Sequence, residues 1–382
     1  MSVVYFLLVL SLVMLGAHAL LAWRLGLGLV TQTRRRLRVV VLLHAPLAPA
    51  AIALTRAAGA PDWVAQLGYI DLGFFSIVFA GVVFVLALDA GRALLGRLGL
   101  PFDPDRRGAF LKTAHLLVVG GAAAETAWGY AQTRAIAEVE EVDLPIAGLA
   151  PGLDGLRIVQ VSDLHVGMPG IDADHVRRVV ERVNGLAPEL VAVTGDLVDG
   201  SVARLNDATA PLADLRARHG SWFITGNHEY YSGVDDWVQR CRDLGMRVLL
   251  NEHALVEHDG ARLLVAGVTD RSAVRMREDH RCDPAAACHA APDADLRLML
   301  AHQPKGAEEM AALGFDVQLS GHTHGGQYFP GTVLIGLIQP FVAGLHRVGQ
   351  MWLYVSRGSA WWGPPLRVGS PAEITLLVLR AV

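Results

Sequence analysis

The chain has 382 residues, of which 52% are hydrophobic and 18% are charged. Such an apolar composition is unusual for a wholly water-soluble protein and indicates that part of the chain lies in a membrane. The formal net charge is -4 at pH 7, and the basic residues gather only beside apolar segments. This pattern excludes a nucleic-acid-binding surface of the usual kind, so we expect no nucleic acid as a partner.

The apolar excess lies before residue 132. Residues 3–23 and 67–88 each form a stretch long enough to cross a bilayer. Residues 39–54 and 113–131 are shorter, or contain more small and polar side chains, and buried core helices would explain runs of that length equally well. Since membrane spans flank them, we predict about four transmembrane helices in residues 1–132.

The arginines predict the orientation of these helices. The connections at residues 24–38 and 92–112 are rich in Arg, whereas the connection at residues 56–66 has one Arg and one Asp. By the positive-inside rule the two basic connections face the cytoplasm. The stretch from Arg106 to Lys112 resembles a twin-arginine export signal, although an ordinary cluster of cytoplasmic positive charge explains it as well. Both interpretations predict a multi-pass inner-membrane protein whose remaining domain is extracytoplasmic.

Five ionisable residues lie in or near these apolar segments. Because a charge in lipid is costly, such residues invite a functional interpretation, for example as a transport path. Most of them lie near a predicted helix end or can pair between helices, so we favour packing or interfacial roles. The residues are His18, His44, Asp71, His115 and Glu125.

From about residue 138 the pattern is that of an α/β domain, which we place at residues 133–382. Alternating apolar residues near 139–144 predict an edge strand, and residues 174–186 and 208–218 predict helices. Further strands are predicted at residues 156–161, 190–193, 221–225, 263–268, 296–301 and 317–320. Most of them are followed directly by polar residues, so a site is expected where the strand ends converge.

Five short motifs follow these strands in order. Together they supply the Asp, Asn and His side chains that two adjacent divalent metal ions require. The motifs are Asp163-Leu164-His165, Gly195-Asp196, Gly226-Asn227-His228-Glu229, Ala301-His302-Gln303-Pro304 and Gly321-His322-Thr323-His324.

The spacing within the motifs supports a metal centre. Asp163 and His165 are two residues apart, so at a strand end they project to one side. The carboxylate of Asp196 has two oxygens and can bridge two ions, although Gly-Asp alone equally suits a turn. His302 ends an apolar run, where an unsatisfied imidazole is costly, so it needs a partner, which a hydrogen bond in the core would also provide.

The remaining two motifs add neutral ligands and a substrate-facing group. Asn227 offers an uncharged oxygen, while the neighbouring His228 points elsewhere and is available to act on substrate. His322 and His324 alternate between glycines that allow close backbone approach, and they can supply one ligand to each of two ions.

The ordered motifs resemble the calcineurin-like metallophosphoesterase superfamily, in particular its bacterial membrane-associated or exported branch. The resemblance extends over residues 155–165, 249–252, 267–270, 302–305 and 354–358, and covers about residue 138 to the carboxyl end. It implies a four-layer α-β-β-α sandwich of two mixed sheets, here preceded by the all-α transmembrane region. Thr269 stands where the resemblance leads us to expect a carboxylate. This departure does not affect any of the expected metal ligands.

The resemblance also implies the roles of the site residues. One divalent ion would be held by Asp163, His165, Asp196 and His324, and the other by Asp196, Asn227, His302 and His322. Asp196 would bridge the ions, which the ligand set allows to be manganese, iron or zinc. The implied activity is hydrolysis of a phosphoric ester by a hydroxide that bridges the two ions, with His228 as the acid.

An extracytoplasmic site beside a membrane favours a phospholipid, a lipid-linked phosphate or a cell-envelope phosphoester as substrate, with membrane lipids as neighbours. The apolar stretch at residues 332–345 is either a flap that touches lipid or a segment packed on a sheet. The polar stretch 271–295 is either a phosphate-gripping lid or a solvated insertion, and Cys282 and Cys288 can close a small loop within it. Two alternatives are a transporter or sensor with a non-catalytic metal-binding domain, and a cytoplasmic nucleotide phosphodiesterase.

Overall fold

A computed structural model describes residues 3–25, 31–58, 60–97 and 104–382 and divides the chain into two compact units. The helical unit comprises the described residues up to Gln132 together with Gly363–Val368. The sheet unit comprises Thr133–Trp362 and Gly369–Val382. The segment Gly363–Val368 is held in the helical unit by packing and by a hydrogen bond from the Arg367 N–H to the Gly129 carbonyl at 3.1 Å. The predicted division into residues 1–132 and 133–382 does not assign this segment to the helical unit.

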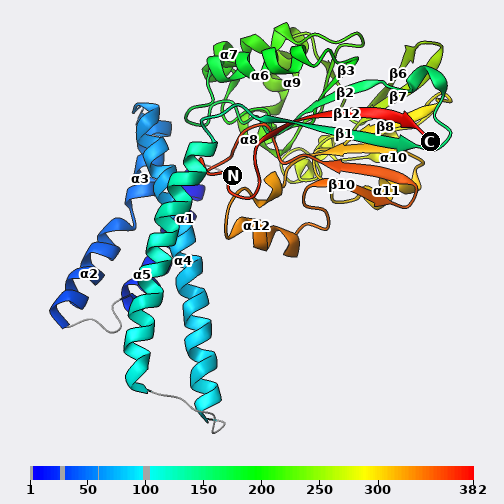
Figure 1. Cartoon of the computed structure of the whole chain (residues 1–382). Coiled ribbons are helices and arrows are strands. Elements are labelled where there is room, and N and C mark those ends of the chain that lie inside the picture. Colours follow the sequence, from blue (N-terminus) through cyan, green and yellow to red (C-terminus); the bar gives the residue numbers. More distant parts are fainter. Residues whose placement is uncertain (1–2, 26–30, 59, 98–103) are drawn as a thin grey trace. The chain divides into compact units, whose positions relative to one another are not determined.

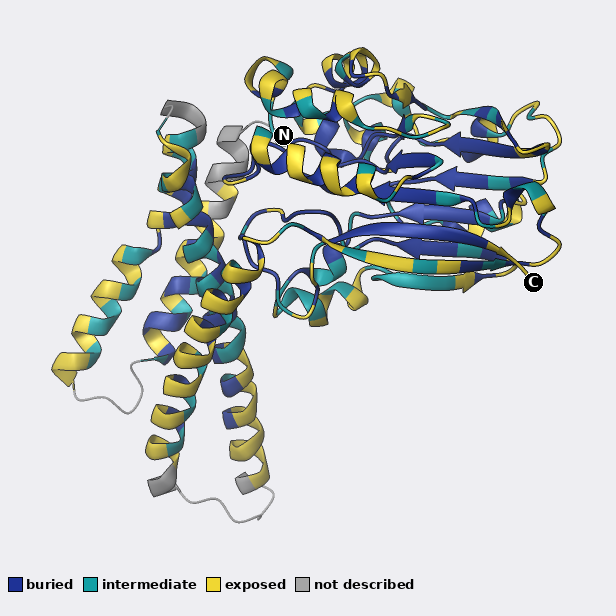
Figure 2. Cartoon of the chain, turned by 45° about the horizontal axis from the view of Figure 1, so that its top comes forward, coloured by how far each residue is buried: buried dark blue, intermediate teal, exposed yellow. Residues whose placement is uncertain are grey.

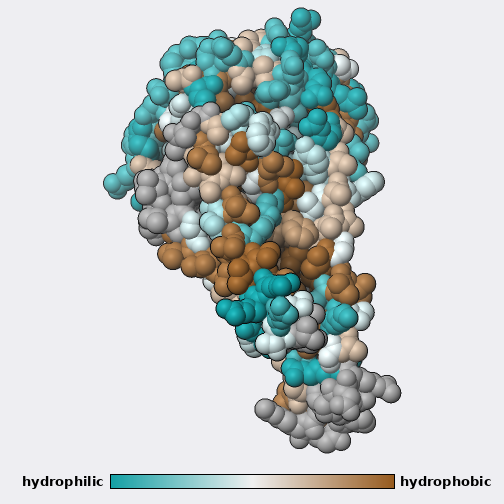
Figure 3. Space-filling model, turned by 90° about the vertical axis from the view of Figure 1, so that its left-hand side faces the viewer, coloured by the Kyte–Doolittle hydropathy of each residue, from teal (hydrophilic) through white to brown (hydrophobic). Residues whose placement is uncertain are grey.

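The described residues of the helical unit up to Gln132 form mainly helices, shown in blue to green in Figure 1. They are α1 (Val3–Arg24), α2 (Thr31–His44), α3 (Leu47–Ala58), α4 (Asp62–Arg97) and α5 (Pro104–Gln132). Among the described residues, Thr31–Thr55 and Asp62–Leu95 are long and apolar enough to cross a membrane, and Ser11–Arg24 is a shorter apolar helix. These helices expose large apolar side chains such as Leu43 and Leu117, and apolar side chains gather on the surface in Figure 3. The expected four spans stay a prediction.

Polar residues of the helical unit pair between helices. His18 Nε2 lies 3.0 Å from His44 Nδ1, and His44 Nε2 lies 2.8 Å from an oxygen of Asp71. Asp89 of α4 accepts hydrogen bonds from both Arg24 and Arg107. These pairs connect α1, α2, α4 and α5, so the polar groups contribute to helix packing.

The sheet unit contains two six-stranded sheets, each with parallel and antiparallel neighbours, as expected for two mixed sheets. The first has the order β1 (Glu138–Ile146), β12 (Glu373–Ala381), β2 (Arg157–Val161), β3 (Leu190–Val193), β4 (Ser221–Phe223), β5 (Arg247–Val248). The second has the order β10 (Gly344–Val348), β11 (Met351–Val355), β9 (Val317–Ser320), β8 (Leu296–Leu300), β7 (Ala261–Gly267), β6 (Glu252–His258).

The two sheets share one buried core. Alternate residues of the first sheet, such as Leu190 and Ala192 of β3, belong to the same cluster as Leu263 and Val265 of β7 in the second. Figure 2 shows the strands as largely buried ribbons. This alternation places one face of each sheet in the shared core. The four-layer arrangement as a whole stays a prediction.

Helices and short turns connect the strands. They include α6 (Ala173–Gly185), α7 (Val202–Thr209), α8 (Asn227–Ser232), α9 (Val234–Asp243), α10 (Pro284–Ala287), α11 (Ala307–Ala312) and α12 (Gly331–Leu334). Helix α6 buries the valine face that its sequence predicts, and the Asp172 side chain caps its first turn by accepting from the His175 N–H.

The helical stretch predicted at residues 208–218 is only partly confirmed, because residues 215–218 are not helical. Helix α7 ends at Thr209, and a 3-10 segment, Ala210–Asp214, follows it. Pro211 lies in the first turn of that segment. Because proline has no N–H to donate, it does not continue an α-helix.

Strand ends decide where the site forms. Strands β2, β3 and β4 are parallel neighbours, and so are β7, β8 and β9. Their carboxyl ends therefore lie along one edge of each sheet. The motif residues follow these ends directly, from Asp163 after β2 to His322 after β9. The fold thus brings residues separated by some 160 positions in the chain to neighbouring strand ends.

Candidate metal centre

Six of the seven expected metal ligands form two groups of side chains. Asp163, His165 and His324 make the first group, and Asp196, His302 and His322 make the second. In each group the ligand atoms lie within 4.8 Å of one another, and all of these residues are buried except the half-buried His322. The sequence therefore predicted residues that do converge, from the ends of β2, β3, β8 and β9.

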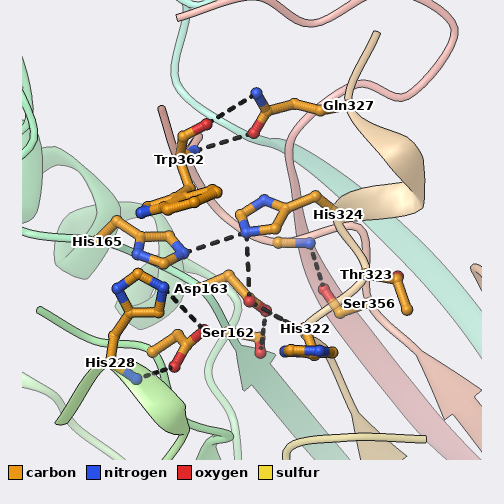
Figure 4. A network of polar contacts seen from close by, with 12 residues as sticks. Ser162, Asp163, His165, His228, His322, Thr323, His324, Gln327, Ser356 and Trp362 are labelled. Carbon is orange, nitrogen blue, oxygen red and sulfur yellow. Dashed lines mark hydrogen bonds and ion pairs between the residues drawn. The ribbon is translucent and has the colours of Figure 1, made fainter. Parts of the chain in front are cut away.

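The ligand atoms within each group face one another. His165 Nε2 lies 3.1 Å from His324 Nε2, and His324 Nε2 lies 3.4 Å from an oxygen of Asp163, as Figure 4 shows. In the second group His302 Nε2 lies 3.0 Å from an oxygen of Asp196. Two imidazole nitrogens and a carboxylate that point at one place form a donor set for a divalent cation.

Two buried atoms test whether this place suits a metal ion. Within the described residues Asn227 Oδ1 has no hydrogen-bond partner, and His302 Nε2 faces the oxygen of Asp196 at 3.0 Å. An unpaired buried oxygen is costly, and a cation at this place would contact both atoms. His302 Nδ1 contacts the Thr194 carbonyl at 2.7 Å, which directs Nε2 toward Asp196. Metal-ligating histidines commonly hold their second nitrogen in this way, so the residues fit a metal ion.

Strained backbone supports the same assignment. Five of the candidate ligands have left-handed φ values: Asp163 at 54°, His165 at 49°, Asp196 at 50°, His322 at 72° and His324 at 52°. Each such conformation costs a residue with a side chain on the order of 1–3 kcal/mol. It persists only where surrounding contacts impose it, and strain of this kind clusters at functional sites. Here it turns each side chain out of its strand direction and toward the others.

Two glycines allow the strand ends to approach closely. A Cβ atom on Gly226 would lie 2.2 Å from Asp196 Oδ1, and one on Gly321 would lie 2.2 Å from Asp163 Oδ2. No side chain fits at either position. The backbone N–H of His228 donates to Asp196 at 2.8 Å, and that of His322 donates to Asp163 at 3.0 Å. The second bond joins the two ligand groups.

Asp199 belongs to the site, although the sequence analysis missed it. One carboxylate oxygen lies 2.6 Å from His165 Nδ1, and the other lies 2.8 Å from His228 Nδ1. Burial alone would raise the pKa of Asp199, but the two histidines lower it well below its usual value. Asp199 is the third residue after Asp196, in Gly-Asp-Leu-Val-Asp, and this second carboxylate beside a candidate ligand was the signal in the sequence. Asp199 thus orients the candidate ligand His165 and the imidazole of His228 together.

Glu229 is a second missed residue. Its buried carboxylate accepts backbone N–H groups of Gly226 at 2.6 Å, Leu197 at 2.8 Å and Asp196 at 3.1 Å. Burial and the charge of Asp196 raise the pKa of Glu229 to about 7, against hydrogen bonds that lower it. By holding three amides, Glu229 fixes the loops that carry Asp196 and Asn227.

His228 points its second nitrogen toward the ligand groups. Its Nδ1 contacts Asp199, and its Nε2 lies 4.0 Å from an oxygen of Asp196. Burial lowers the pKa of His228, but Asp196 and Asp199 outweigh burial and raise that pKa to about 9. The imidazole therefore carries a proton at neutral pH in this arrangement.

The polar stretch 271–295 was predicted to be either a phosphate-binding lid or a solvated insertion. Within the insertion, Arg271 pairs with Glu309, and Arg277 pairs with Asp235 and Asp279, so both guanidinium groups already have carboxylate partners. Cys282 and Cys288 are free thiols and do not close a loop. His280 of the same insertion contacts the Tyr230 hydroxyl at 3.1 Å. These contacts favour the interpretation as an insertion over that of a lid.

The family model of the calcineurin-like phosphoesterases matches residues 156–326, which contain all the candidate ligands. A zebrafish protein, described as a transmembrane protein with metallophosphoesterase domain, is 34% identical over 84% of this chain and 74% of its own length. The chain belongs to the calcineurin-like phosphoesterase family. As a member of this metallophosphoesterase family it is a metal-dependent hydrolase of phosphoric esters.

Relatives of this metallophosphoesterase come from animals and bacteria. A bovine protein with the same description is 36% identical over 82% of this chain and 72% of its own length. An uncharacterized metallophosphoesterase of Helicobacter pylori is 37% identical over 59% of this chain and 60% of its own length. The family resemblance is thus confirmed, but it is not confined to a bacterial branch.

Proposed function

We propose that this metallophosphoesterase holds two divalent ions and hydrolyses a lipid-linked phosphoester beside a membrane. Asp163, His165 and His324 bind the first ion. Asp196, Asn227, His302 and His322 would hold the second, and the second carboxylate oxygen of Asp196 would be available to the first. The observation that carries the proposal is the pair of ligand groups at adjacent strand ends, joined by the hydrogen bond between Asp163 and His322.

The chemistry divides between the ions and the chain. Two bound divalent ions supply a nucleophilic hydroxide at neutral pH and neutralise charge on the phosphoryl oxygens. The chain supplies the proton for the leaving group, which His228 donates from Nε2 because Nδ1 is engaged by Asp199. Asp199, which contacts Nδ1 at 2.8 Å, favours the protonated form of that imidazole. Manganese, iron and zinc all suit this donor set.

The membrane part of the proposal rests on three observations. Two helical stretches are long and apolar enough to span a bilayer, and relatives of 34% and 36% identity are described as transmembrane proteins. The basic connections then face the cytoplasm, which leaves the sheet unit on the extracytoplasmic side of an inner membrane. The protein is multi-pass in this proposal.

An exposed apolar segment supports a lipid substrate. Helix α12 and the following 3-10 turn, Ile335–Leu337, begin soon after the ligand His324. Their side chains are exposed rather than packed on a sheet: Val333 at 64%, Leu337 at 80% and Ile338 at 72%. Short apolar segments of this kind enter the interfacial region of a bilayer. The exposed side chains within residues 333–338 thus support the flap that touches lipid, whereas Phe341 of the same stretch packs against the core of the second sheet.

Hydrolysis of bis-p-nitrophenyl phosphate by the detergent-solubilised chain with added manganese tests the chemistry. The wild type should turn the diester over, and Asp196→Asn should not, since the change removes a charge from the centre of the site. If neither protein releases nitrophenolate from this diester or from the corresponding monoester, the sheet unit is a non-catalytic metal-binding domain of a transporter or sensor.

Protease access tests the orientation. Protease added to intact spheroplasts should cleave the sheet unit, whereas the same protease should spare a cytoplasmic control protein. Protection of the sheet unit until the membrane is opened would place it in the cytoplasm, and would favour a nucleotide substrate over a lipid.

A further inference from the structure

Two exposed aromatic rings contact the same imidazole. The ring of His228 lies 5.2 Å from that of Tyr231 and 5.3 Å from that of Trp362, with interplanar angles of 73° and 72°. Tyr231 is 59% exposed and Trp362 is 45% exposed. Single exposed aromatic residues are ordinary on protein surfaces. Two that both pack against the proton donor of a hydrolase place an apolar surface where the leaving group departs.

Local structure brings Tyr231 to this place. Helix α8 begins at Asn227, so Tyr231 is four residues beyond this candidate ligand and three beyond His228. Residues at these separations lie on one face of a helix. The ring of Tyr231 thus stands beside both the metal-binding end of α8 and the imidazole, and solvent reaches it.

Trp362 comes from a distant part of the chain and is held by a dedicated contact. The Gln327 side chain accepts the backbone N–H of Trp362 at 2.9 Å and donates to the Trp362 backbone carbonyl at 3.1 Å, as the dashed lines in Figure 4 show. Gln327 is buried, and its own N–H donates to the carbonyl of the ligand His324 at 3.0 Å. These two hydrogen bonds therefore hold the backbone of Trp362 relative to the candidate ligand His324.

Burial in the core does not explain this arrangement. The neighbouring Trp361 is only 5% exposed and packs in the interior, whereas Trp362 keeps nearly half of its surface in solvent. Restricting an apolar ring while leaving it in water gains little for folding. The arrangement gains its value when another apolar group covers the ring.

We propose that Trp362 and Tyr231 form a binding subsite for the leaving group, which prefers a phosphoester whose leaving group is apolar next to the ester oxygen. The proposal rests on the proposed function, because it takes His228 as the donor to that oxygen. The shared chemistry is hydrocarbon surface against an aromatic ring, which a lipid chain and a flat aryl group both provide. Small hydrophilic leaving groups gain nothing from the rings.

Three esters with different leaving groups test this subsite in the full-length, manganese-loaded protein. They are the phosphates of hexanol, phenol and glycerol, used as monoesters or as methyl diesters according to which class the wild type hydrolyses. Trp362→Ala and Tyr231→Ala should each raise KM for the hexyl and phenyl esters by about tenfold, and leave KM for the glycerol ester unchanged. Gln327→Ala should shift KM in the same direction by less, because Trp362 stays but is no longer held.

Controls separate binding from folding. Trp352 pairs with Val317 at the start of β9, whereas the ligand His322 follows the end of that strand, so Trp352→Phe should leave all three KM values unchanged. Trp362→Phe should restore part of the preference for the apolar esters. A larger effect of Trp362→Ala on the hexyl ester assigns the subsite to hydrocarbon chains, and a larger effect on the phenyl ester assigns it to flat rings.

Two outcomes overturn the proposal. If Trp362→Ala lowers kcat equally for all three esters, the ring only supports His228 and does not bind the leaving group. If the variant discriminates among the esters as the wild type does, the rings are not a subsite. Absence of turnover in the wild type contradicts the proposed function itself, and is thereby distinct from both.

Discussion

A carboxylate oxygen of Asp199 lies 2.6 Å from Nδ1 of His165 and fixes the orientation of this candidate ligand. We expect Asp199→Asn to weaken metal affinity about 10- to 100-fold, because the amide presents either a weaker acceptor or a second donor to Nδ1. The measurement is a manganese titration of activity after chelation, together with calorimetric binding. Asp214→Asn, at an exposed carboxylate, is the matched control and should not change affinity. Equal affinities of wild type and Asp199→Asn would contradict this role.

Replacing Glu229 should loosen the loops that carry Asp196 and Asn227. In Glu229→Gln an amide NH2 would face backbone N–H groups from which the carboxylate now accepts hydrogen bonds. We expect the free energy of unfolding to fall by about 1–3 kcal/mol, and kcat to fall with it. Chemical unfolding of the solubilised protein measures the first and turnover the second. The exposed Glu181→Gln serves as control, and a variant as stable and active as that control would show that the carboxylate is dispensable.

A methyl group at Gly226 should abolish activity. Its Cβ would lie 2.2 Å from Asp196 Oδ1 and 2.5 Å from the Asp196 backbone nitrogen, so Asp196 must move. A displacement of about 1 Å at a reacting centre costs on the order of 100-fold in rate, and we expect at least that loss in Gly226→Ala. Gly185→Ala is the control, because a Cβ there meets nothing within 4 Å. The measurement is the steady-state turnover of the two variants, and equal turnover in both would contradict this expectation.

The proposed role of His228 as proton donor predicts that the loss of activity depends on the leaving group. His228→Gln should lower kcat by about 100- to 10,000-fold for an alkyl ester, which needs a proton to depart. A p-nitrophenyl ester should lose much less, because nitrophenolate departs without protonation. Comparing the two substrates in one preparation controls for changes in folding or metal content. Equal losses for both esters would assign His228 to binding the phosphoryl group instead.

Acid should destabilise the sheet unit through His175. Burial and Arg178 lower the pKa of His175 to about 4, from an ordinary value of 6.5. Protonation thus favours the unfolded chain, so this stabilising contribution is complete above pH 6.5 and is lost as pH falls toward 4. The loss approaches about 3 kcal/mol in full, and about 2 kcal/mol by pH 5.

Unfolding of the solubilised wild type and of His175→Gln at pH 7 and pH 5 checks this expectation. The wild type should lose more stability between the two pH values, because glutamine does not titrate. Identical losses in both proteins would mean that other groups cause the acid sensitivity.

Local patterns in the sequence determined much of the sheet unit. The strands at residues 190–193 and 317–320 were predicted with the observed bounds, and the edge position of β1 was expected. A hydrophobic run that ends at Gly and a polar residue is a local signal, so it predicts a strand without knowledge of the neighbouring strands. The predicted ligands follow these strand ends and therefore converge once the parallel strands align.

Only the tertiary structure decided the supporting contacts. Strand β12 lies between β1 and β2, Asp199 joins two histidines, and Gln327 holds Trp362. Each depends on the register between segments far apart in the chain, and on backbone turned into the left-handed region by contacts that no local pattern encodes. The sequence by itself determined which side chains could serve a metal centre, and the packing of the two sheets decided how they are aimed and which other residues hold them.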